Sequence, residues 1–80
     1  MSGYVLIEAD VGRAAEVTTF AARLAGVRSA DEITGPYDVI VSAVEMDPTR
    51  FLRLVEEIER LAGVTRTIPC PAGARMPVAA

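Results

Sequence analysis

Hydrophobic and polar positions along this 80-residue chain show two periodicities, one typical of strands and one typical of helices. Short runs rich in β-branched and aromatic residues predict strands at Tyr4–Ala9, Val27–Ile33, Val39–Val44 and Val64–Ile68. Between them, apolar residues recur at helical spacing over Arg13–Ala25 and Pro48–Leu61. A glycine follows each helix, Gly26 or Gly63, and can take the left-handed conformation that ends a helix. The pattern therefore predicts the element order βαββαβ.

The chain also repeats itself, because a shift of 37 positions superimposes much of its first half on its second. The shift aligns identical or similar residues at Ile7 and Val44, Glu8 and Glu45, Asp10 and Asp47, Arg13 and Arg50, Val17 and Leu54, Arg23 and Arg60, and in the two LAGV segments. One half is too small to bury its own apolar faces, so the two halves must pack together. Two βαβ halves joined at Gly35 predict an α+β, ferredoxin-like fold, with a four-stranded antiparallel sheet and both helices on one face.

The predicted third strand is largely apolar on both of its faces. Val39, Val41 and Ala43 alternate with Ile40, Ser42 and Val44. Helices can cover only one side of the sheet, and an exposed apolar face of this kind needs a cover. A second copy of the chain is the simplest cover, so we predict a homodimer that pairs through the open sheet face.

Length and charge set the broad class of the protein. The pattern predicts one domain over residues 1–69, followed by a flexible, proline-containing tail over 70–80. The net charge is −3 and the eight cations are scattered arginines, which argues against direct binding of nucleic acid or of an anionic membrane. The sequence shows no leader and no membrane-spanning run, and it contains a single cysteine, Cys70. These features predict a soluble cytoplasmic protein. Arginine without lysine suggests a GC-rich bacterial genome.

Missing residue types exclude most enzyme chemistry. The chain contains no His, Trp, Lys, Asn or Gln. A Ser–His or Cys–His nucleophile has no base here, and a zinc or copper site lacks its ligands. The glycines are isolated and form no phosphate-binding loop. We therefore expect no catalytic residues, no metal, no cofactor and no enzyme activity.

The turn between the predicted second and third strands has two interpretations. Gly35 and Pro36 supply the backbone geometry that a strand connection needs, so Tyr37 and Asp38 could simply complete the turn. Thr34, Tyr37 and Asp38 also offer a hydroxyl, an aromatic wall and a carboxylate within five residues. These groups suit a small molecule that carries an ammonium group, with loop N–H groups taking its acid.

Three segments of the chain carry a family resemblance, YVLIEAD at Tyr4–Asp10, ITGPYDVIV at Ile33–Val41 and LAGVTRT at Leu61–Thr67. Through them the chain resembles the effector-binding domain of Lrp/AsnC (feast/famine) transcriptional regulators, also called the RAM domain. The resemblance covers about Tyr4 to Ile68. It implies a ferredoxin-like fold, dimers paired through their sheets, and octamers or similar rings. It also implies that an amino acid or related metabolite binds between dimers.

The resemblance further implies that Thr34, Gly35, Tyr37 and Asp38 contribute to the ligand site, with Thr65 and Thr67 as candidate contributors from the last strand. Pro36 removes one backbone donor from that turn. The regulators begin with a helix-turn-helix domain, whereas here the first strand starts by Tyr4. The chain is therefore expected to be a stand-alone effector domain that does not bind DNA itself and that can co-assemble with a full-length regulator.

Three other classes stay open at this point. A dimeric α/β-barrel enzyme of the cofactor-free monooxygenase type would enclose a cavity between two such sheets. An ACT-type regulatory module would bind its ligand by the first strand-to-helix loop, here Ala9–Arg13, where Gly12 is suggestive. A purely structural assembly subunit would form the oligomer without any ligand.

Overall fold

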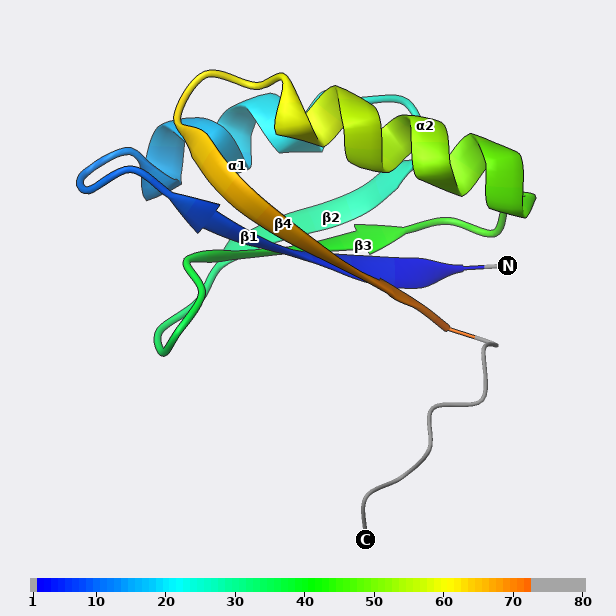
Figure 1. Ribbon diagram of the computed structural model, residues 1–80, viewed down its shortest axis with the longest axis horizontal. Helices are drawn as coiled ribbons and strands as arrows, with labels where there is room; N and C mark the ends of the chain where they lie inside the picture. Colours follow the sequence, from blue (N-terminus) through cyan, green and yellow to red (C-terminus); the bar gives the residue numbers. More distant parts are fainter. Residues whose placement is uncertain (1, 73–80) are drawn as a thin grey trace, which may run out of the picture.

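Six elements follow one another in the order βαββαβ in the computed structural model, which describes residues 2–72. They are β1 (Gly3–Ala9), α1 (Ala14–Ala22), β2 (Val27–Glu32), β3 (Val39–Ala43), α2 (Pro48–Glu59) and β4 (Val64–Pro71). The four strands form one antiparallel sheet in the order β2-β3-β1-β4. Both helices lie on the same face of that sheet (Figure 1). The predicted ferredoxin-like fold is confirmed, with the first and third strands in the centre.

The core lies between the helices and one face of the sheet, and it follows the alternation of the two central strands. Alternate residues of β1 and β3 point toward the helices, and five of these apolar side chains are buried, namely Val5, Ile7, Val39, Val41 and Ala43. The helices close this layer with Val17, Ala21, Phe51, Leu54, Val55 and Ile58. Burial of these side chains removes apolar surface from water, which is the main favourable term in folding. Residues 2–72 of one chain place no helix over the opposite face of the sheet.

Both helices end earlier than the sequence predicted, α1 at Ala22 and α2 at Glu59, with Arg23 and Arg60 as their C-caps. Gly26 and Gly63 lie in the turns that follow and leave room for an arginine from the other half of the chain. Gly26 has φ +93° and Gly63 has φ +92°, conformations that residues with a Cβ rarely adopt. A Cβ at Gly63 would lie 3.2 Å from Arg13 Nε, and one at Gly26 would lie 3.8 Å from an Arg50 guanidinium nitrogen. Each repeat thus places the arginine at the start of its helix beside the loop that follows the other helix.

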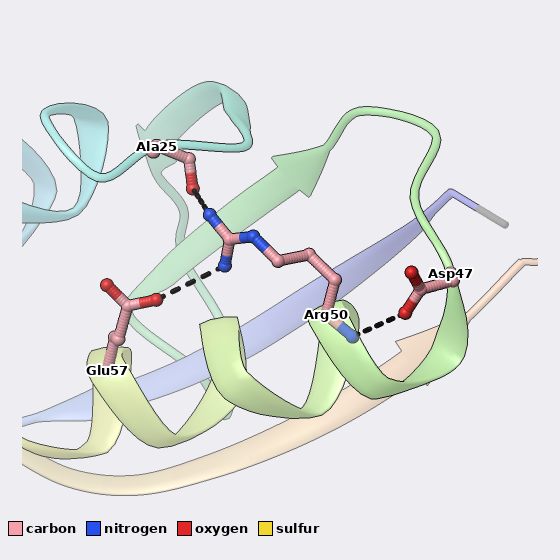
Figure 2. A network of polar contacts seen from close by, with 4 residues as sticks. All are labelled: Ala25, Asp47, Arg50 and Glu57. Atoms are coloured by element: carbon pink, nitrogen blue, oxygen red, sulfur yellow. Dashed lines mark hydrogen bonds and ion pairs between the residues drawn. The ribbon is translucent and has the colours of Figure 1, made fainter.

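Arg50 ties α2 to the end of α1, as Figure 2 shows. Its guanidinium donates to Ala25 O at 3.1 Å and to Glu57 Oε1 at 3.3 Å. Its backbone N–H donates to Asp47 Oδ1 at 2.8 Å, which makes Asp47 the N-cap predicted by the Asp-Pro pair. The corresponding Arg13 instead pairs with Glu16 at 2.7 Å, and this hydrogen bond and charge raise the pKa of Arg13.

Replacing Asp47 by alanine is expected to lower the free energy of unfolding by about 1 kcal/mol, because the Arg50 N–H then loses its acceptor. Urea denaturation followed by circular dichroism measures this loss. Asp47→Asn is the matched control, since asparagine caps helices about as well as aspartate. Equal losses in both variants would contradict a capping role for Asp47.

The last strand is longer than the sequence predicted. β4 continues to Pro71, with Cys70 paired to Tyr4 and Pro71 paired to Gly3. Pro69 and Pro71 fit here because β4 is an edge strand, where a proline can turn its missing N–H away from the ladder. The flexible tail expected from residue 70 therefore cannot begin before the end of β4, and residues 73–80 lie outside the described residues.

Candidate functional site

The turn at Thr34–Asp38 joins β2 to β3 at the end of the sheet where β1 also ends (Figure 1). The turn is closed by Ile33 N, which donates to Asp38 O at 2.9 Å. Asp38 N donates to Ile7 O at 2.9 Å, so the turn is also fastened to β1. Gly35 has φ +124°, and a Cβ there would meet no atom within 4 Å. Glycine is thus required by the backbone conformation and not by lack of space.

The Asp38 side chain reaches across to β1. Its Oδ2 accepts a hydrogen bond from Ala9 N at 2.8 Å. Pairing between β1 and β4 changes register between Glu8 and Ala9, and the carboxylate bonds the Ala9 amide at this irregularity. Among residues 2–72, Oδ1 of Asp38 has no hydrogen-bond partner. Asp38 therefore combines a structural bond through one oxygen with a second oxygen that is free to accept a bond.

Of the two candidate threonines on β4, Thr65 lies near this end of the sheet. Its hydroxyl donates to the backbone oxygen of Glu8 at 2.9 Å, beside the same register change. Asp38 and Thr65 thus lie on opposite sides of the end of β1. Thr67 pairs with the buried Ile7, and its hydroxyl donates to Glu59 Oε2 on α2 at 3.0 Å. Thr65 therefore lies at the end of the sheet that carries the turn, separated from it by β1, whereas the Thr67 hydroxyl is directed toward α2.

The remaining candidates line the exposed side of the turn. Thr34 and Gly35 are exposed, and Tyr37 is half-buried.

Sequence reasoning missed Glu8, which follows an apolar strand run and whose carboxylate oxygen Oε1 lies 3.4 Å from the Thr65 hydroxyl. The signal for it was available, since Glu8 is the only acid in the first predicted strand and aligns with Glu45 in the repeat.

Residues 2–72 of one chain enclose no pocket at this end of the sheet or elsewhere. The same residues contain no group of three or more His, Cys, Asp or Glu side chains placed to hold a metal ion. None of their helices is long and apolar enough to cross a bilayer. A small molecule bound at the turn would therefore contact an open surface of this chain.

The open face of the sheet carries an apolar patch that we call the open-face patch, made of Tyr4, Leu6, Ile40, Ile68 and Cys70. The strand register joins these positions, because Leu6 pairs with both Ile40 and Ile68, and Tyr4 pairs with Cys70. Tyr4 is 48% exposed, and the other four side chains are half-buried. Glu8 and Arg66 pair at one end of the patch.

The amino-acid sequence matches the model of a known family. A family model described as the Lrp/AsnC ligand binding domain matches residues 2–68. The chain belongs to this family. The Lrp/AsnC domain matched here spans all six elements, including the turn and most of β4. A comparison with curated proteins finds no match.

Solved structures share the fold of this Lrp/AsnC domain. The crystal structure of TTHA0845 from Thermus thermophilus is 28% identical, with a TM-score of 0.85, and the match covers 95% of this chain and 96% of that one. FFRP-DM1 is 21% identical, with a TM-score of 0.80 over 89% of this chain and 96% of that one. PH0061 is 22% identical, with a TM-score of 0.74, and the match covers 91% of this chain but 51% of PH0061. The same fold thus occurs both as nearly a whole chain and as about half of a longer one.

Proposed function

We propose that this Lrp/AsnC domain is an effector-binding subunit without enzyme activity, which binds an amino acid or a closely related metabolite at the Thr34–Asp38 turn. One observation carries the proposal. Asp38 is held in place through Oδ2 by the Ala9 amide, while Oδ1 has no partner within residues 2–72. A fixed carboxylate with one free oxygen is suited to an ammonium group, because hydrogen bonds between charged groups are stronger than those between neutral groups.

The other groups of the turn complement that carboxylate. Tyr37 supplies an aromatic wall, and the exposed Thr34 supplies a hydroxyl. The exposed backbone around Gly35 offers N–H groups for the ligand carboxylate, with Pro36 as the one position that cannot donate. Thr65, on the far side of the end of β1, is the contributor from β4. Thr67 is not part of the proposed site, because its hydroxyl bonds to α2.

The site is proposed to be completed by a second subunit, since residues 2–72 of one chain enclose no pocket there. We propose that the open-face patch pairs with the same patch of another copy to give a homodimer. Such an isologous contact uses one surface twice and leaves the turn at the outer end of each sheet. Dimers would then assemble into an octamer or similar ring, in which a neighbouring dimer covers the turn.

The regulatory role follows from this assembly. Binding of an effector between dimers changes the balance between dimers and rings, because a ligand shifts an equilibrium by its differential affinity for the two states. We propose that the chain acts in the cytoplasm on transcription of metabolic genes, by co-assembling with a full-length Lrp/AsnC regulator. It would sense the metabolite, and its partner would bind the DNA.

Replacing Asp38 by asparagine is expected to weaken amino-acid binding by about ten- to a hundredfold, because the ammonium then loses a charged acceptor. Asparagine keeps an oxygen that can accept from Ala9 N, so thermal stability should change little. Isothermal titration calorimetry against the common amino acids, first with the wild-type chain, measures the effect.

Asp38→Ala is the comparison variant. It removes both the charge and the acceptor for Ala9 N, and is therefore expected to lose binding and also about 1–3 kcal/mol of stability. A folded Asp38→Asn protein with unchanged affinity would overturn the assignment of this turn. A wild-type chain that binds no amino acid would overturn the proposed ligand class.

A further inference from the structure

The two helices lie on the same face of the sheet and correspond in the repeat, yet their outer sides differ in charge. α2 carries five charged residues among its twelve positions, whereas α1 carries only Glu16 among its nine. The exposed positions of α1 are Ala15, Thr19 and Ala22. The positions that correspond to them in α2 are Leu52, Glu56 and Glu59. The outer side of α2 is thus largely charged, whereas the three exposed positions within α1 carry small, uncharged side chains.

The threonines of α1 add little polar character to this side. Thr18 Oγ1 donates to Ala14 O at 2.7 Å, and Thr19 Oγ1 donates to Ala15 O at 3.1 Å. Because both hydroxyl protons are already donated within the helix, burial of this side would leave no hydroxyl donor unsatisfied. Side chains of this size also allow another helix to approach closely, since the distance between helix axes depends on the residues at the contact.

Two charges flank the exposed Thr19 in a self-complementary arrangement. Glu16 and Arg23 are seven residues apart, which places them on the same side of the helix, roughly 10 Å apart along its axis. Thr19 lies near the midpoint between them. Glu16 bonds to Arg13 but keeps 40% of its side chain exposed, and Arg23 is exposed, with no ion pair within residues 2–72. An antiparallel second helix centred on Thr19 would place its Arg23 opposite Glu16, and its Glu16 opposite Arg23.

We propose that the outer side of α1 is a second interface between copies of this chain, in which two α1 helices pack antiparallel about a two-fold axis near Thr19, with reciprocal Glu16–Arg23 ion pairs. Charge complementarity selects a second copy as the occupant. This contact lies on the helix side of the molecule, opposite the open-face patch (Figure 1). A chain with two different two-fold interfaces can link dimers into closed dihedral assemblies, so the contact supplies a route from dimer to ring.

Thr19→Arg tests this interface, because two arginines would then meet at the two-fold axis. Light scattering over a range of protein concentrations is expected to give a wild-type mass above that of a dimer. The variant is expected to fall to a dimer, twice the chain mass of 8.5 kDa. Leu52→Arg is the matched control, since it adds the same charge at a 60% exposed position of α2 and should leave the mass unchanged. A Thr19→Arg protein with the wild-type mass, or a wild-type chain that never exceeds a dimer, would overturn the proposal.

A charge exchange provides a second test that does not depend on the bulk of arginine. Glu16→Arg and Arg23→Glu should each lower the mass by placing like charges together, and the double variant should restore it. A double variant that stays dissociated would overturn the antiparallel arrangement. Titration of the same samples with amino acids separates this inference from the proposed function. Large assemblies that bind no amino acid would overturn the proposed function alone. Large assemblies that persist in Thr19→Arg and still bind amino acids would overturn the α1 contact alone.

Discussion

Replacing Phe51 by alanine is expected to lower the free energy of unfolding by about 3–5 kcal/mol, the largest loss of stability that we predict for a single substitution. Phe51 is 1% exposed and heads the largest fully buried side chains of the core. A Cβ placed on Gly3 would come within 2.9 Å of a ring carbon, so the ring fits closely against the start of β1. Alanine would leave a cavity under α2 that the sheet cannot fill.

Urea denaturation followed by circular dichroism measures this loss. Small domains are stable by about 5–15 kcal/mol in total, so the variant should be markedly destabilised or unfolded at room temperature. Leu52→Ala is the matched control, because the neighbouring side chain is 60% exposed and its truncation should cost less than about 0.5 kcal/mol. Similar losses in the two variants would mean that α2 does not pack through Phe51.

Replacing Ile40 by aspartate is expected to break the proposed pairing of sheets, which leaves at most two chains joined through α1. Ile40 lies on central strand β3 and pairs with Leu6 in the middle of the open-face patch. A carboxylate buried between two such patches has no partner and loses its hydration, which costs several kcal/mol. In a chain with an unpaired open face the same carboxylate meets water, so the fold should persist while association through the open face is lost.

Sedimentation equilibrium of the Ile40→Asp protein measures the association. The reactivity of the Cys70 thiol measures separately whether the open face is covered. This thiol is free and lies on the open face beside Tyr4. It should react slowly with a disulfide reagent in the wild-type assembly and faster in the Ile40→Asp protein, whose open face is uncovered. Leu52→Asp introduces the same group on α2 and should change neither property. An Ile40→Asp protein of wild-type mass with a slow thiol would contradict pairing through the open face.

The fold was predictable from the sequence because its signals are local and repeated. Alternation in Tyr4–Ala9 and Val39–Val44 gave the central strands. The glycines at 26 and 63 marked the turns after the helices, which end at Ala22 and Glu59. The Asp-Pro pair at 47–48 gave the N-cap. Each of these depends on residues within one element, so a single chain is enough to predict it.

Contacts between elements were harder to predict. The bond from Ala9 N to Asp38 joins residues 29 positions apart, and it arises from a register change that no local pattern marks. For the same reason the sequence alone could not separate Thr65 from Thr67, which differ only in the partner that each hydroxyl finds. The length of β4 was underestimated because Pro69 and Pro71 signal a strand end, although an edge strand accepts them.

Hydrogen–deuterium exchange with and without a bound amino acid tests the central claim most directly, because it locates the ligand on the intact assembly. The account predicts slower exchange at the amides of the Thr34–Asp38 turn and at Ala9, whose amide bonds to Asp38. Protection confined to the Asp10–Arg13 loop would contradict the account and favour an ACT-type site. Exchange that no amino acid changes anywhere would contradict effector binding itself.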